Sequence, residues 1–216
     1  PAQSVDGTTV AYEASLVGTT NGCSQIFVVD ADGFDDRLVS NGGAARSPSF
    51  SPSSTLLLYT EQQDTSPCTP SNHHTSSISA TSAHHAHATH SPSPHTPRMP
   101  GVLIARNLDH GDVTSPKGAA SFEGEILEAT YGPDARHIAI IAIDEETART
   151  TLHLLDTQDE EAPAQQLALP PSVQAPLDVA FDASATRLIF TAQPDPARPH
   201  VRELYLWEIA TGTLEQ

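Results

Sequence analysis

Seven histidines lie close together in one segment, and they are the first candidates for chemistry. They are His73, His74, His84, His85, His87, His90 and His95. Neutral imidazole is a good ligand for zinc, copper and nickel ions. The irregular spacing, however, lacks the closed ligand geometry of a structural metal site. Two interpretations stay open: weak metal capture with a charge that depends on pH, or a low-complexity composition without a metal role.

A run of aspartates at residues 30–36 (DADGFDD) is the second candidate, because Ca²⁺ prefers carboxylate oxygens as ligands. Gly33 comes too early for an EF-hand loop, and the glutamate that should close such a loop is absent. We interpret the run as a turn between two outer strands, with calcium binding as the alternative.

The chain has two cysteines, Cys23 and Cys68. Each lies in a connection between the second and third strands expected in neighbouring repeats, and these connections belong to one face. A disulfide between the two is therefore possible, and it would imply an oxidising compartment. Two free thiols are the alternative.

Catalytic motifs are absent from the sequence. It contains no GxSxG, HExxH or GxGxxG pattern and no P-loop. Serines are abundant, but none lies in a recognisable activating context. We therefore expect no catalytic residue and no cofactor, and we do not expect this chain to be an enzyme by itself.

The elements that position these residues follow from an internal repeat. The four copies read PAQSVDGTTVAY at 1–12, PSFSPSSTLLLY at 48–59, ATYGPDARHIAI at 129–140 and VAFDASATRLIF at 179–190. Each copy is a short apolar strand, a polar turn and a second apolar strand. Repeats of about 40–50 residues with four short strands each indicate the blades of a β-propeller. The expected fold class is all-β, with about four blades of four antiparallel strands.

Each repeat should begin with an inner strand beside a central channel. The strands expected are 9–13, 25–30 and 36–40 in repeat one; 47–51, 56–60, 102–107 and 112–115 in repeat two; 127–131, 137–143, 151–156 and 165–169 in repeat three; and 178–181, 187–192, 202–209 and 213–215 in repeat four. Large side chains recur at two positions and are expected to pack between blades. The inner-strand position holds Gln3, Phe50, Tyr131 and Phe181, and the second-strand position holds Tyr12, Tyr59, Ile140 and Phe190.

Residues 62–100 interrupt the repeat with serine, threonine, proline, alanine and histidine. Such a composition cannot bury enough apolar surface to offset the entropy of ordering. We expect a disordered loop, inserted between the second and third strands of repeat two.

These motifs resemble the TolB-like repeat, a relative of the WD-repeat β-propellers. IFVVDADGFDDRLVS at 26–40 looks like the first half of that repeat, and SPSFSPSSTLLLY at 47–59 looks like the second. The match is weaker where Gly132-Pro133-Asp134 and Asp182-Ala183-Ser184 replace Ser-Pro-Asp-Gly. In this motif a residue able to take φ > 0 serves the hairpin tip, which is a requirement of the fold and not of catalysis.

The resemblance also implies six or more blades in a complete ring. Because the chain begins inside a repeat, we expect a part of a larger ring and marginal stability for this part alone.

The charge of the chain restricts its partners. With 27 acidic and 10 basic residues, the net charge is −17. This field repels nucleic acid and anionic membranes, and it favours cationic partners. No apolar run is long enough to span a bilayer. We expect a protein or peptide partner, no nucleic acid and no membrane insertion.

The resemblance favours a non-catalytic binding module that is periplasmic, envelope-associated or secreted. One alternative is the gating propeller of a prolyl-oligopeptidase-like serine peptidase, whose catalytic domain would lie outside this chain. The other is a metal-binding surface protein that uses the histidine-rich segment.

Overall fold

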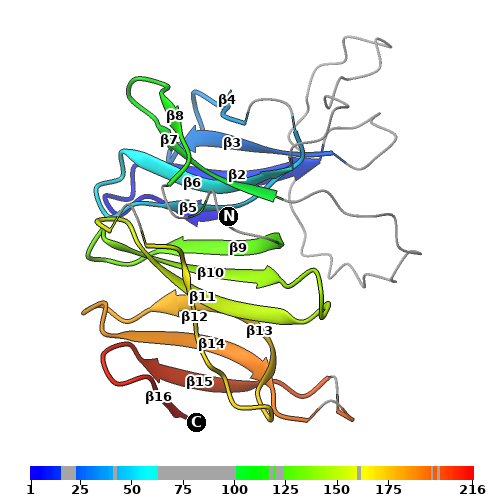
Figure 1. Ribbon diagram of the computed structural model, residues 1–216. Helices are drawn as coiled ribbons and strands as arrows, with labels where there is room; N and C mark the ends of the chain where they lie inside the picture. The colour runs from blue at the N-terminus through cyan, green and yellow to red at the C-terminus, as the bar shows by residue number, and fades with distance from the viewer. Residues whose placement is uncertain are drawn as a thin grey trace.

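The computed structural model describes residues 1–15, 23–40, 43–62, 101–116, 119, 124–159, 162–195, 197–198 and 200–216. These residues form strands, and no helix among them is long and apolar enough to cross a membrane. The strands make four antiparallel sheets, each built from four strands that are consecutive in the sequence (Figure 1). The all-β prediction is confirmed. We call the sheets blades one to four in chain order.

Strand bounds agree with the expected ranges to within a few residues. Blade one contains β1 (Ala2–Gln3), β2 (Thr9–Ser15), β3 (Ser24–Asp30) and β4 (Arg37–Leu38). Blade two contains β5 (Ala45–Phe50), β6 (Leu56–Gln62), β7 (Gly101–Asn107) and β8 (Val113–Thr114). Blade three contains β9 (Glu125–Tyr131), β10 (His137–Ile143), β11 (Thr150–Asp156) and β12 (Gln165–Gln166). Blade four contains β13 (Gln174–Phe181), β14 (Arg187–Gln193), β15 (Glu203–Glu208) and β16 (Thr213–Glu215).

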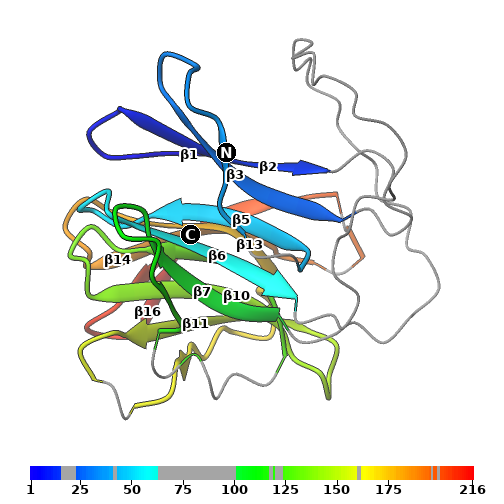
Figure 2. The same ribbon diagram turned by 90° about the horizontal axis from the view of Figure 1, so that it is seen from above.

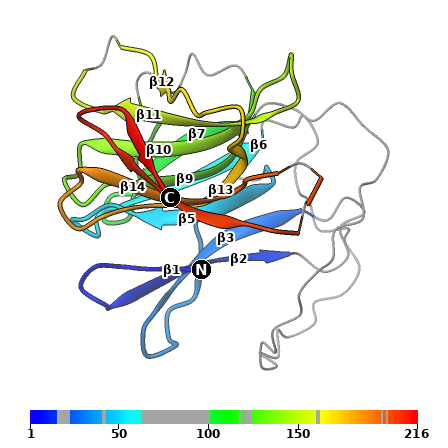
Figure 3. The ribbon, with the colours of Figure 1, turned by 90° about the horizontal axis from the view of Figure 1, so that it is seen from below.

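The blades follow one another in the order of the sequence, from blade one at the top of Figure 1 to blade four at the bottom. Figure 2 views this stack from the blade-one end and Figure 3 from the blade-four end. The first strands β5, β9 and β13 each pack on the blade before their own. The extensive contacts between blades therefore join neighbours along the chain.

Three apolar cores lie between the four blades. One joins blades one and two, the next joins blades two and three, and the last joins blades three and four. The second strands of the middle blades, β6 and β10, are buried on both faces, because a blade packs on each side. In β2 and β14 burial alternates from residue to residue, as expected for a sheet with one covered face.

The hairpin between the first and second strands has the same backbone in every blade. These hairpins span 4–8, 51–55, 132–136 and 182–186. Their fourth residues are Gly7, Ser54, Ala135 and Ala185, with φ of 74°, 61°, 56° and 55°. The expected positive φ is confirmed, but three of the four positions are not glycine. Left-handed backbone costs an ordinary residue about 1–2 kcal/mol, so packing and hydrogen bonds must hold these turns.

The histidine-rich segment connects two strands that are paired along their whole length. Gln62 ends β6, Gly101 begins β7, and the two residues face each other in the ladder. Residues 63–100 lie outside the described part of the chain. Strands β6 and β7 of blade two flank this segment, and the disordered loop expected at 62–100 stays a prediction.

Candidate functional site

Two sets of loops from all four blades meet at one end of the sheets. They are the hairpins after the first strands (4–8, 51–55, 132–136 and 182–186) and the described residues of the turns after the third strands (31–36, 108–112, 157–159, 162–164 and 209–212). Because the strands are antiparallel, both sets lie at the same end, on the left of Figure 1. We call this end the hairpin face, and the other end the opposite face.

One backbone hydrogen bond recurs in each blade of the hairpin face. The N–H of the residue after the third strand donates to a carbonyl near the end of the hairpin. The pairs are Ala31 to Thr8 at 2.7 Å, Leu108 to Thr55 at 2.9 Å, Thr157 to Arg136 at 2.8 Å and Ile209 to Thr186 at 2.9 Å. Each blade therefore presents its hairpin and its turn as one connected unit.

Aspartate side chains stabilise the hairpins by accepting hydrogen bonds from residues of the same hairpin. The Oδ1 atom of Asp182 accepts the N–H groups of Thr186 and Arg187, at 2.8 and 2.9 Å. The Ser184 hydroxyl also donates to Asp182. This hydroxyl, with the backbone donors, lowers the pKa of Asp182 to about 2. Asp6 has the same role in blade one, where bonds from Ser4 and Thr8 lower its pKa.

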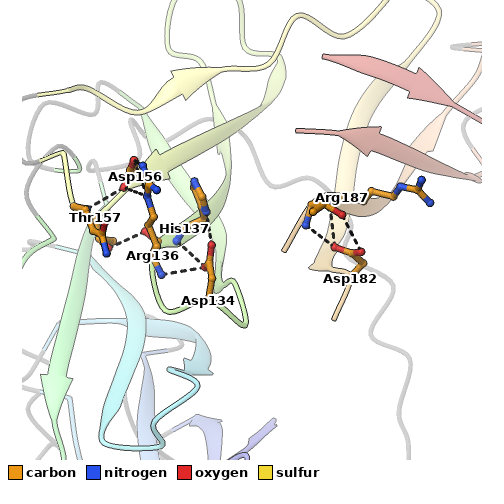
Figure 4. Close-up of polar contacts among 9 residues, drawn as sticks. Asp134, Arg136, His137, Asp156, Thr157, Asp182 and Arg187 are labelled. Atoms are coloured by element: carbon orange, nitrogen blue, oxygen red, sulfur yellow. Dashed lines mark hydrogen bonds and ion pairs between the residues drawn. The ribbon is translucent and has the colours of Figure 1, made fainter. Parts of the chain in front are cut away.

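Blade three adds two side-chain contacts to this arrangement (Figure 4). The Arg136 guanidinium clamps Asp156, with Nε 2.9 and 3.0 Å from the two carboxylate oxygens. This contact holds the pKa of Asp156 well below its usual range. His137 Nδ1 lies 2.6 Å from Asp134 Oδ2. Burial opposes ionisation of Asp134, but hydrogen bonds from the His137 N–H and imidazole and from the Arg136 N–H lower its pKa.

The pair of His137 and Asp134 has the geometry of a catalytic histidine and the carboxylate that orients it. A nucleophilic mechanism would also need a hydroxyl or thiol within hydrogen-bond reach of the imidazole. Among the described residues, the imidazole bonds to Asp134 alone. The same carboxyl group accepts two backbone N–H bonds of its own hairpin. The pair therefore stabilises a turn.

Blade one differs from the other blades because it exposes large apolar side chains on the hairpin face. Val5 is 73% exposed and Phe34 is 70% exposed. Their loops are joined by the bond from Ala31 to Thr8, and the Val5 N–H also donates to the Ser54 hydroxyl at 3.0 Å. Leu108 and Ile209, the apolar residues that begin the turns of blades two and four, pack against the cores between blades.

The turn that carries Phe34 is ordered by its own backbone and by one carboxylate. The Phe34 N–H donates to Asp32 Oδ1 at 3.1 Å, and its carbonyl accepts the Asp30 N–H at 3.0 Å. Asp35 and Asp36 follow directly and are exposed. Phe34 is therefore held at the tip of an acidic turn.

The first strands carry polar contacts between neighbouring blades. Ser49 meets Thr130 at 3.2 Å, and the Asp178 N–H donates to Glu128 at 3.1 Å. Burial raises the pKa of Glu128, and the nearby Asp178 charge raises it further. These contacts fix one blade against the next and leave the hairpin face in a defined arrangement.

Two hollows lie at the opposite face. One of about 30 Å³ lies between blades two and three, near Arg46 and Glu125. The other, of about 310 Å³, is an open groove in blade four near Tyr205 and Glu203. The first has room for about one water molecule.

The structure describes only some of the residues that the sequence analysis proposed as functional. All seven histidines and Cys68 lie outside the described residues, so the metal site and the disulfide to Cys23 stay predictions. The acidic run at 30–36 forms the turn between β3 and β4, as expected. Within the described part of the chain, no three histidine, cysteine or acidic side chains converge as metal ligands, which gives no support to calcium at this turn.

The expected packing of the recurring large side chains is confirmed for most of them. Phe50, Tyr59, Ile140 and Phe190 are buried in the cores between blades, and Tyr131 and Phe181 pack against these cores. Tyr12 is half-buried, because no described blade covers that side of blade one. Sequence reasoning missed the exposed pair of Val5 and Phe34. The available signal was an aromatic residue inside a turn otherwise made of aspartate, glycine and alanine.

Comparison with solved structures decides the fold. TolB from Acinetobacter baumannii superposes with a TM-score of 0.64 at 14% identity, over 99% of this chain and 41% of that one. The putative TolB from Agrobacterium tumefaciens gives 0.65 at 15% identity, over 99% and 62%. The β-propeller domain of the Trilobed protease from Pyrococcus furiosus gives 0.57 at 13% identity, over 100% and 54%.

The chain has a β-propeller fold. It spans less than two thirds of each of these three propeller-containing chains. No protein-family model matches the sequence, and no curated protein matches it. The four sheets therefore fit a part of such a propeller, as the resemblance implied.

Proposed function

We propose that this propeller is a non-catalytic binding module that docks a protein or peptide partner on its hairpin face. The single observation that carries the proposal is the exposed pair of Val5 and Phe34. Large apolar side chains held in the open at ordered turns are typical anchors of an interface. Burial of both by a partner would remove this apolar surface from water.

The surroundings of this pair favour a basic partner. Asp32, Asp35 and Asp36 lie in the same turn as Phe34, Asp30 ends the strand before it, and Arg37 begins the next strand. The chain as a whole carries a net charge of −17. Charge complementarity would steer a cationic segment to this face and speed its association. The partner we infer presents apolar side chains beside lysine or arginine.

Two observations support a role without catalysis. The imidazole of His137 has no nucleophile beside it among the described residues. The sequence lacks the common hydrolase, metalloprotease and nucleotide-binding motifs. Similarity of fold to TolB structures supports a place in the cell envelope or outside the cell. The predicted pair of Cys23 and Cys68 would fit such an oxidising compartment.

A second candidate function rests on the similarity to the propeller domain of the Trilobed protease. In that case the propeller would gate a serine peptidase domain encoded outside residues 1–216. The two functions differ in the native protein: the second requires a GxSxG segment and peptidase activity, which sequencing and an assay of the native product would reveal.

Peptide display tests the proposed function directly. Peptides selected on the wild-type chain should be rich in basic and large apolar residues. Phe34→Ser should lose most of their binding, because it removes an exposed anchor and no core contact. The control Val113→Ser, an exposed apolar residue on β8 of blade two, should bind as the wild type does. Selected peptides that bind both variants equally would overturn the assignment to this face.

A further inference from the structure

One repeat position in the first strands of blades two, three and four carries a polar residue that bonds to a neighbouring blade. It holds Ser47, Glu128 and Asp178, three residues before the recurring aromatic side chain. The Ser47 hydroxyl donates to the Leu127 carbonyl of blade three at 2.9 Å, and we call this contact the Ser47 joint. The Asp178 N–H of blade four donates to Glu128 Oε2 at 3.1 Å, and we call this contact the Glu128 joint. The Ser47 joint is neutral, whereas the Glu128 joint brings two acidic residues together.

Strand β13, on the blade-four side of the Glu128 joint, departs twice from regular pairing with β14. The register shifts between Gln174 and Leu177 and again between Leu177 and Ala180. Each shift contains a left-handed residue, Ala175 with φ of 47° and Asp178 with φ of 52°. Left-handed backbone is unfavourable for residues other than glycine. This part of β13 therefore needs support from its neighbours.

Blades three and four each contribute support to the bulged part of β13. From blade three, Glu128 accepts the backbone N–H groups of Asp178 and Val179. Within blade four, the Thr191 hydroxyl donates to Asp178 Oδ2 at 3.0 Å, and Arg202 Nε donates to the Thr191 hydroxyl oxygen at 3.2 Å. The carboxylate of Glu128 thus holds a strained strand of the next blade.

The surroundings of Glu128 disfavour its charge. Glu128 pairs with Ile141 of the core between blades three and four, so its side chain faces blade four. Burial raises the pKa of Glu128 above its ordinary value of 4.5, the Asp178 charge raises it further, and the two N–H groups offset this only in part. Among the described residues, Asp178 is the one whose charge shifts the pKa of Glu128. Other titratable or charged side chains on β9 and on the strands that contact it are Arg46, Tyr59, Glu61, Arg106, Glu125, Tyr131 and His137.

We propose that Glu128 and Asp178 form a proton-controlled joint that sets how firmly blade four packs on blade three. When Glu128 binds a proton, the cost of a buried charge and the repulsion from Asp178 both disappear, while one carboxyl oxygen can still accept N–H groups. The joint then tightens, and it loosens when both groups are charged. Because the pKa of Glu128 is raised in the folded chain, its contribution to stability is complete below pH 4.5 and is lost as the pH rises through the folded value.

The test is amide hydrogen exchange of the wild-type chain and Glu128→Gln, at about pH 7 and about pH 4.5, with mass spectrometry of peptides that contain β13. Glutamine removes the charge and keeps an oxygen that accepts N–H groups. At neutral pH, β13 should exchange more slowly in the variant than in the wild type. At the acidic pH this difference should shrink. Comparison at one pH cancels the contribution of His153 and the pH dependence of intrinsic exchange, since both chains share them.

The Ser47 joint is the internal control, because it lacks a carboxylate. Peptides that contain β5 should change less between the two chains than peptides that contain β13. An equal change in both would indicate general stabilisation of the fold and would overturn a local joint. Faster exchange of β13 in Glu128→Gln at neutral pH also overturns the proposal, since the charged carboxylate would then be the tighter form.

Asp178→Asn tests whether the two acidic residues act together. Asparagine removes the second charge, and its amide oxygen can accept the Thr191 hydroxyl. In this background Glu128→Gln should slow the exchange of β13 at neutral pH by a smaller factor than in the wild type, because the repulsion is already absent. An equal factor in both backgrounds would show that Glu128 responds to burial alone, and the pair as proposed would be wrong.

Discussion

Phe190 stacks on Tyr205 with ring centroids 5.8 Å apart, and both rings are buried between blades three and four. Tyr12 and Phe27 occupy the same two positions of the repeat in blade one, with almost the same stacking geometry. The same aromatic pair thus occurs once in a closed core and once on an uncovered face. A comparison of the two pairs therefore separates the stability gained by burial in a core from the stability gained by ring stacking alone.

This contrast predicts unequal costs of truncation. Phe190→Ala should lower the free energy of unfolding by about 3–5 kcal/mol, because it leaves a cavity in a buried core. Tyr12→Ala should cost about 1 kcal/mol, since water can fill the space and only a surface aromatic pair is lost. Urea unfolding at low protein concentration measures both losses. Equal losses would show that the Tyr12 side of blade one is covered in solution.

The left-handed backbone at the hairpin tips predicts that a glycine placed there would stabilise the fold. Ala135 is exposed and has φ of 56°, which glycine adopts without the penalty of a Cβ atom. Ala135→Gly should therefore raise the free energy of unfolding by up to about 1 kcal/mol. Ala183→Gly is the matched control, an exposed alanine of the blade-four hairpin that is not left-handed, and it should be neutral or destabilising. A loss in Ala135→Gly would contradict the hairpin geometry.

The pairing of Gln62 with Gly101 predicts that the histidine-rich segment is dispensable for the fold. Replacement of residues 63–100 by Asn-Gly leaves a two-residue hairpin, which such facing residues can close. The shorter loop should raise the free energy of unfolding by about 2 kcal/mol from closure entropy. Circular dichroism and urea unfolding, both under reducing conditions to remove any effect of Cys68, measure this. Loss of the strand signal would show that the segment supports blade two.

The environment of His153 predicts a dependence of stability on pH. Burial lowers the pKa of His153 from 6.5 to about 4, although Asp144 opposes the shift. The unfolded chain binds this proton first, so the contribution of His153 is complete above pH 6.5 and is lost as the pH falls toward 4. The loss amounts to about 3 kcal/mol.

Between pH 6.5 and about 4, the free energy of unfolding of His153→Gln should change less with pH than that of the wild type. Parallel profiles for the wild type and His153→Gln would mean that His153 is accessible to water in the folded chain.

Much of the fold follows from local sequence, whereas the candidate site does not. The alternation of apolar residues and the polar turns locate nearly every strand, because both signals are carried by neighbouring residues. The range 165–169 was too long: β12 contains only Gln165 and Gln166, and Leu167 is buried in the core between blades three and four. Exposure of Val5 and Phe34 depends on what neighbouring loops cover. A local sequence pattern does not show which side chains the neighbouring loops cover. Tyr12 and Tyr59, for example, occupy the same position of the motif and differ in burial.

The most direct test of docking on the hairpin face is photo-crosslinking in the producing cells. A benzophenone amino acid would replace Phe34 on the hairpin face or Glu146 on the opposite face, both of which are exposed. Docking on the hairpin face should give a discrete crosslinked protein from position 34 and none from position 146, and the product should be lost when Asp32 and Asp35 are changed to asparagine. A discrete product from position 146 alone, or no product from either position, would contradict it.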